Sequence, residues 1–98
     1  MTGWASMAIE KLQGGESVVI TPRGRSMAGR VEDGQTVVVH PVNITELAVG
    51  DVVLCKVAGR QYLHLVKAID GTRFQIANNK GRINGWIGPA SIYGKAVI

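Results

Sequence analysis

Short runs rich in valine and isoleucine, separated by glycine, proline, asparagine and aspartate, dominate this chain from residue 17 onward. Branched side chains at this density favour β-strands, and the residues between them favour turns. The pattern predicts strands at Ser17–Thr21, Thr36–His40, Asp51–Ala58, Gln61–Ile69, Thr72–Ala77 and Ile92–Val97. Strands this short and this closely spaced indicate a mainly β fold, a small coiled antiparallel sheet or partly open barrel.

Three glycine-containing turns support this prediction. Asp70-Gly71, between two β runs, is the strongest hairpin signal in the chain. Asp33-Gly34 and Gly50-Asp51 each precede a valine-rich run, and their glycines allow a positive φ at the start of a strand. Both are interpreted as ordinary β-turns and not as a repeat of domain scale.

The first residues have a different periodicity and predict one short helix over residues 2–13. Its apolar residues recur on one helical face, at Trp4, Met7, Ala8 and Leu12. Thr2 stands at the N-cap position, and Gly14-Gly15 ends the helix. The apolar face would lie over the barrel as a lid or contact another subunit.

The size and composition indicate one domain over residues 1–98, with the helix and a linker at 1–15 and a β core at 16–98. The chain is 46% hydrophobic and 18% charged, which favours a packed core over disorder. No run approaches the roughly 18 apolar residues of a membrane span. The histidines, His40 and His64, are far apart and no Cys or His pair has ligand spacing, so neither a metal site nor a cofactor is expected.

The net charge of +4 permits a nucleic-acid partner, but the basic residues are scattered. Small groups occur at Arg23, Arg25 and Arg30 and at Lys80 and Arg82, without a basic tract of five or more or interleaved aromatics. A basic β-barrel that binds nucleic acid is therefore the weakest of three functional hypotheses. The single cysteine, Cys55, lies in an apolar run and indicates a buried, reduced thiol in a cytoplasmic compartment.

Candidate chemistry centres on Ser26, which lies between small, permissive residues in Gly24–Gly29 after a β run and a Pro22 turn. A serine nucleophile needs a base within hydrogen-bond reach. Strand alternation places His64 on the face opposite Lys67, and an imidazole with a pKa of about 6.5 accepts a proton near neutral pH more readily than an amine. Taken as isolated residues, such a serine and such a histidine are more often structural.

Four stretches, taken in order, resemble the serine peptidase superfamily of signal peptidases and self-cleaving LexA-like repressors. They are Gly24-Arg25-Ser26-Met27, Leu47–Val53, Tyr62–Val66 and Gly88–Val97. The resemblance covers residue 17 to the C-terminus and implies the LexA/signal-peptidase type of fold. It further implies that Ser26 is the nucleophile, with Met27 beside it, and that His64 is the general base, as in the histidine-type signal peptidases.

The same resemblance implies a substrate and an oxyanion site. The Ser26 N–H would help to stabilise the oxyanion. An extended peptide would lie along a strand edge, with a small side chain beside the nucleophile.

Departures from the family pattern bear on activity. The histidine-type enzymes carry a Gly-Asp-Asn segment whose Asp orients the base, and this chain has Ala77-Asn78-Asn79 there. Asn78 thus takes the position of the orienting acid, or else belongs to an ordinary turn, and Asp51 or Asp70 could substitute. Neither a membrane anchor nor a DNA-binding domain is recognised, no Ala-Gly cleavage bond precedes Ser26, and the proline that often follows Ser-Met is replaced by Ala28-Gly29.

The leading hypothesis is a small soluble serine endopeptidase with a Ser26–His64 dyad acting on an extended peptide. The alternative is a weak or inactive family member that serves as a peptide-docking or dimerisation module. In that case a homodimer would form through the edge of the C-terminal strand, Ser91–Ile98.

Overall fold

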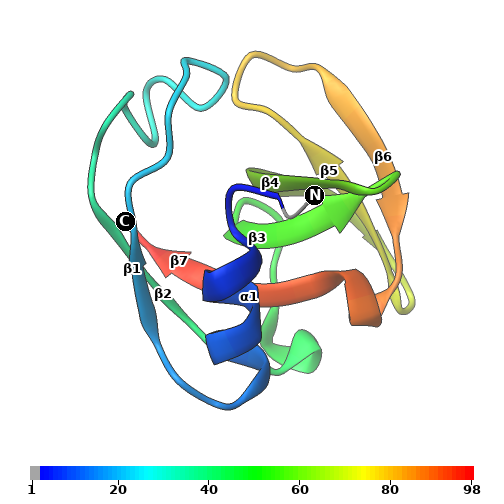
Figure 1. The fold of residues 1–98 in the computed structure, drawn as a ribbon. Coiled ribbons are helices and arrows are strands. Elements are labelled where there is room, and N and C mark those ends of the chain that lie inside the picture. The colour runs from blue at the N-terminus through cyan, green and yellow to red at the C-terminus, as the bar shows by residue number, and fades with distance from the viewer. Residues whose placement is uncertain (1–2) are drawn as a thin grey trace.

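The computed structural model describes residues 3–98, which form one short helix, seven strands and two 3-10 turns (Figure 1). The helix is α1 (Ser6–Gln13). The strands are β1 (Val18–Ile20), β2 (Val37–His40), β3 (Val52–Val57), β4 (Arg60–Asp70), β5 (Arg73–Ala77), β6 (Ile83–Ile87) and β7 (Ile92–Val97). The 3-10 turns are η1 (Ile44–Glu46) and η2 (Pro89–Ser91). The mainly β prediction is confirmed, and each predicted strand matches an observed one to within one residue at either end.

All seven strands form one antiparallel sheet in the order β1-β2-β7-β3-β4-β5-β6. Within residues 3–98 no ladder joins β1 to β6, so the sheet is not closed. The sheet is strongly curled, which brings β6 close to β3. A Cβ added to Gly85 of β6 would lie 3.3 Å from Val57 of β3. The Asp70-Gly71 prediction is confirmed, since the β4–β5 hairpin closes at the pair Asp70 and Arg73 with Gly71 at a φ of 59°.

The strand that the sequence did not predict is β6. Its middle reads Asn84-Gly85, and Asn-Gly is the dipeptide most typical of a hairpin turn. In the structure Gly85 pairs with Ile76 and Ile83 pairs with Ala77, so Asn84 is an extra, bulged residue within the strand. Pairing with β5 therefore overrides the local turn preference.

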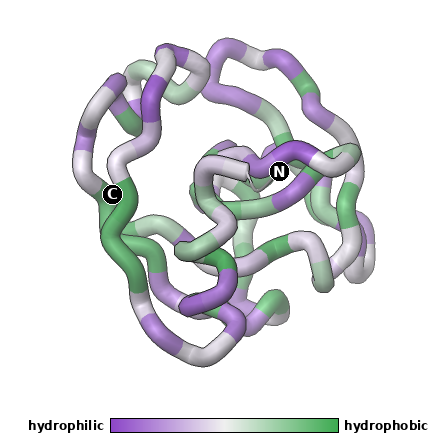
Figure 2. The backbone as a smooth tube through the Cα atoms, viewed as in Figure 1, coloured by the Kyte–Doolittle hydropathy of each residue, from purple (hydrophilic) through white to green (hydrophobic). Residues whose placement is uncertain are grey.

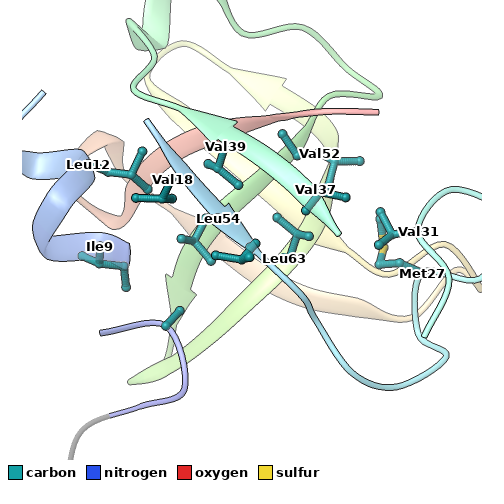
Figure 3. Packing of buried hydrophobic residues seen from close by; sticks show 13 residues of the cluster. Ile9, Leu12, Val18, Met27, Val31, Val37, Val39, Val52, Leu54 and Leu63 are labelled. Atoms are coloured by element: carbon teal, nitrogen blue, oxygen red, sulfur yellow. The ribbon is translucent and has the colours of Figure 1, made fainter. Parts of the chain in front are cut away.

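Two apolar clusters lie on opposite faces of β3, which is buried along most of its length. Leu54 belongs to the first cluster, which runs from α1 across β1 and β2 to the loop that carries Met27 and Val31 (Figure 3). Val53 belongs to the second cluster, enclosed by β4, β5 and β6. Because the curled sheet uses both faces of β3, the two clusters form the interior of one body.

Helix α1 packs over β1 and β7 through Ile9 and Leu12, each of which contributes about 1.5–3 kcal/mol by burial. Leu12 approaches Gly94 of β7 so closely that an added Cβ would lie 3.1 Å from its Cδ2. The predicted apolar face was partly wrong, because Met7 is 77% exposed and Trp4 precedes the helix. The helix begins at Ser6 without a side-chain cap, and the predicted cap, Thr2, lies outside the described residues.

The C-terminal strand lies inside the sheet. β7 pairs with β2 on one side and with β3 on the other. The expectation that Ser91–Ile98 offers a free edge for a second copy is thus wrong, because Lys95 has strand partners on both sides. What β7 does expose is part of an apolar row formed by Val19, Val38 and Val97, which are in register across three strands near the C-terminus (Figure 2). Among the described helices none is long and apolar enough to cross a membrane.

Candidate functional site

Ser26 lies in a series of tight turns between β1 and β2. The Ala28 N–H donates to the Arg25 carbonyl at 3.1 Å, and the Val31 N–H donates to the Met27 carbonyl at 2.8 Å. Met27 and Val31 are 4% and 3% exposed and anchor these turns in the first cluster (Figure 3). Met27 thus lies beside Ser26 in the fold as in the sequence, and its buried side chain holds the half-buried serine in a fixed place.

A second loop, the β5–β6 turn, holds the serine loop from the other side. The Asn79 N–H donates to the Ser26 carbonyl at 2.9 Å, and Asn79 Nδ2 donates to the Ala28 carbonyl at 2.8 Å. Arg30 Nε in turn donates to Asn79 Oδ1 at 3.0 Å. These bonds join residues about fifty positions apart, which is why sequence reasoning did not identify Asn79 as a supporting residue.

His64 lies on β4, opposite Val53 of β3 and one residue before β4 begins to pair with β5 at Leu65. Its side chain is 6% exposed, and its ring lies 4.7 Å from that of Tyr62 between centroids. Lys67 is exposed and is the extra residue of a bulge in the pairing of β4 with β5. The histidine is thus buried and the lysine exposed, as expected if they do not address the same point, although a bulge interrupts the alternation at Lys67.

The structure brings Ser26 and His64 together. Ser26 Oγ lies 3.1 Å from His64 Nε2, although the two residues are 38 positions apart in the chain. This is hydrogen-bond distance, the requirement for proton transfer between a nucleophile and its base.

The other ring nitrogen contacts Asn84, which the sequence reading did not identify. His64 Nδ1 lies 2.7 Å from Asn84 Oδ1. Asn84 reaches the ring because it is the bulged residue of β6, and Gly85 beside it has a φ of 146°, which a residue with a side chain rarely adopts. Bulges next to active sites commonly redirect a side chain in this way. The only sequence signal was Asn84-Gly85 itself, which resembles a turn.

The contact with Asn84 determines the tautomer of His64. An amide oxygen accepts but does not donate, so Nδ1 carries the proton and Nε2 presents its lone pair to the Ser26 hydroxyl. Burial lowers the pKa of His64 below its ordinary value of 6.5, and the hydrogen bond with Asn84 offsets this in part. The imidazole is therefore neutral at pH 7, the form that accepts a proton.

Asn78 lies in the β5–β6 turn and does not orient the histidine. Its Oδ1 accepts hydrogen bonds from the Lys80 and Arg82 N–H groups, both at 2.9 Å. This corrects the expectation that Asn78 stands where the family's acid would act, and agrees with its alternative interpretation as a turn residue. Asp51 and Asp70 do not substitute for that acid either. Asp51 accepts from Ala48 N and pairs with Lys95 at 3.3 Å, whereas Asp70 ends β4 at the hairpin.

A cavity of about 500 Å³ opens beside the pair, and Ser26 and His64 form part of its wall. It extends past Tyr62 to Trp4, in the segment that precedes α1. Between residues 3 and 98, no three His, Cys, Asp or Glu side chains are grouped so that they could hold a metal ion. The arrangement joins a hydroxyl, a neutral imidazole and a cavity, groups that a nucleophilic mechanism would use.

Comparisons with known proteins identify no relative. No protein-family model matches this chain, and neither a curated protein nor a solved structure matches it significantly.

Proposed function

We propose that this protein is a small serine endopeptidase of the signal-peptidase/LexA-like type, with Ser26 as nucleophile and His64 as general base. The observation that carries the proposal is the 3.1 Å contact between Ser26 Oγ and His64 Nε2 at the wall of a cavity. Both residues lie in stretches of the chain that resemble the family. The open, curled sheet is compatible with the fold of that family.

In the proposed reaction, the Ser26 hydroxyl attacks a peptide carbonyl and His64 Nε2 takes its proton. The carbonyl oxygen becomes an oxyanion, and the Ser26 N–H, which bonds no acceptor within residues 3–98, is available to donate to it. His64 then protonates the leaving amine as the C–N bond breaks. Water, deprotonated by His64, releases the acyl group and regenerates the serine.

An unpaired stretch of β4 supports an extended substrate. Arg60–His64 pairs with β3 on one side, and within the described residues it has no strand partner on the other, because pairing with β5 begins at Leu65. The Gln61 carbonyl on this stretch already accepts a hydrogen bond from Trp4 Nε1, so a peptide could add through main-chain hydrogen bonds at the part of the edge nearest His64. This edge ends at His64, so a peptide bound along it would place its backbone close to Ser26.

The test is mass spectrometry of a peptide mixture incubated between about pH 6 and 9, so that His64 is sampled in its neutral form. Wild type is expected to produce new termini that are absent with Ser26→Ala and with His64→Ala. Ser17→Ala and His40→Ala are matched controls, because Ser17 Oγ and His40 Nδ1 form a similar contact on an exposed surface that does not line the cavity. An active Ser26→Ala protein, or no cleavage by folded wild type, would contradict the peptidase.

The alternative is a catalytically inactive docking or dimerisation module. Two observations favour it: His64 faces an amide where a carboxylate would stabilise its protonated form, and the row of Val19, Val38 and Val97 is exposed. A dimer through this row would bury the sheet face, not the edge of β7. Sedimentation should then show a dimer that dissociates in Val38→Lys but not in the control Val49→Lys, which alters an exposed valine elsewhere.

A further inference from the structure

The cavity beside Ser26 is larger and more apolar than a small side chain requires. A cavity of about 150 Å³ with apolar walls is enough to hold a benzene ring, and this one has about 500 Å³. Its deeper wall includes Met27, Val31 and Leu63, all buried and apolar. It therefore has room for an aromatic or large aliphatic side chain together with part of the backbone that carries it.

The charged residues at the cavity do not favour a charged ligand. Arg23 and Glu32 are its only charged lining residues among residues 3–98, and they are of opposite sign. His64 is neutral at pH 7, for the reason given above. Because the side chains of Arg23 and Glu32 are both exposed, an apolar group gains burial here without burying either charge.

Trp4 lines the same cavity as the serine, and one residue of β4 holds it there. Trp4 Nε1 donates to the Gln61 carbonyl at 3.1 Å, and the Ala5 N–H donates to Gln61 Oε1 at 2.7 Å. Gln61 Nε2 donates to Ser6 Oγ at 2.9 Å. Because Ala5 is also buried, the segment is fixed at three successive residues, and a half-exposed indole stands at the cavity.

We propose that this cavity selects a large apolar side chain of the peptide next to the cleaved bond, and that Trp4 is a specificity-determining residue. The inference rests on the proposed peptidase function and replaces the small side chain that the family resemblance implies. Trp4 would contact the substrate side chain directly, since aromatic pairs favour stacked or edge-to-face contact.

The first test is the residue distribution around the cuts in the peptide mixture. Wild type is expected to favour Phe, Tyr, Leu or Met over Ala and Gly by tenfold or more at one position beside the cut. Trp4→Ala should reduce this preference several-fold, whereas Met7→Ala, an exposed apolar residue that does not line the cavity, should keep it. A preference for Ala, Gly or Ser, or an unchanged profile in Trp4→Ala, would overturn the inference.

A second test separates the cavity from the chemistry. The chain has two tryptophans, so Trp86→Phe leaves Trp4 as the only indole fluorophore. In the Ser26→Ala background, capped hexapeptides that differ only in one central Phe, Leu or Ala should be titrated. Phe and Leu peptides should change the Trp4 emission at concentrations at least tenfold lower than the Ala peptide, and equal titrations would overturn the inference. Selective binding without cleavage by wild type would uphold the cavity and contradict the peptidase.

Discussion

His64 Nδ1 lies 2.7 Å from Asn84 Oδ1, so the buried imidazole is oriented by an amide and not by a carboxylate. The amide oxygen selects the tautomer that a general base needs, but it carries no charge to stabilise the imidazolium formed during proton transfer. Ser26 and His64 therefore lie at a distance that allows proton transfer, but the neutral Asn84 amide stabilises the protonated imidazole less than a carboxylate would.

Asn84→Asp is expected to increase cleavage tenfold or more and to raise the pKa of His64, because a carboxylate at this distance stabilises the protonated ring. Peptide cleavage rates and an NMR titration of His64 would measure both effects. Asn78→Asp is the matched control, since it makes the same change in the neighbouring turn, where the side chain accepts backbone N–H groups. Equal effects of the two substitutions would contradict the assignment of Asn84.

Cleavage should be independent of pH from about 7 upward and should fall only below the ordinary histidine pKa of about 6.5, because burial lowers the pKa of His64 in the folded protein. The unfolded chain takes up this proton at higher pH than the folded chain does. The contribution of His64 to the free energy of unfolding is therefore fully present above about pH 6.5 and is lost as pH falls towards the folded pKa. Denaturant titrations from pH 5 to 8 should show this loss in wild type and a smaller one in His64→Gln. An equal loss in both proteins would contradict the prediction.

Gly85→Ala should lower stability by about 1–3 kcal/mol and also reduce cleavage. The alanine would have to adopt the φ of 146° that Gly85 has, and its Cβ would lie 3.3 Å from Val57. The bulge that presents Asn84 would therefore shift. Gly71→Ala is the control, at a φ of 59° in the hairpin turn with no atom within 4 Å of its added Cβ. It should lose stability without losing activity, as measured by thermal melting and peptide cleavage. A Gly85→Ala protein of unchanged activity would show that the bulge does not position Asn84.

Asn79→Ala should reduce cleavage more than stability. It removes two side-chain hydrogen bonds between the β5–β6 turn and the serine loop, a loss of about 1–3 kcal/mol, and frees the backbone next to Ser26. Asn43→Ala is a matched control, because the Asn43 side chain also makes two hydrogen bonds, in which its Oδ1 accepts from the N–H and the hydroxyl of Thr45 at η1. If both variants lost activity in proportion to stability, Asn79 would have only a general structural role.

Cys55 should not react with a thiol reagent in the native protein. It is fully buried, and burial raises the pKa of its thiol to about 12, so almost no thiolate is present at neutral pH. With a thiol reagent that releases a chromophore on reaction, absorbance should show rapid labelling of one thiol per chain in denaturant. Labelling of the native protein should be far slower. Rapid labelling of the folded protein would contradict the packing around β3.

Local sequence determined much of the secondary structure of this protein. Valine-rich runs locate the strands because branched side chains suit a pleated, half-buried surface, and Asp70-Gly71 specifies a hairpin because its glycine accepts a positive φ. Alternation along the strand also predicts that His64 and Lys67 do not address the same point. These features depend on neighbours a few residues away, which the sequence displays directly.

Only the tertiary structure decided which polar groups surround the candidate site. Asn78 and Asn84 look alike in the sequence, and the bulge between β5 and β6 brings the second of them to His64 while the first closes a turn. Likewise, Trp4 reaches the cavity through hydrogen bonds to Gln61, more than fifty residues away. Such contacts arise from strand register and from the curl of the sheet. Register is set by the packing of both faces of β3, so no local pattern specifies it.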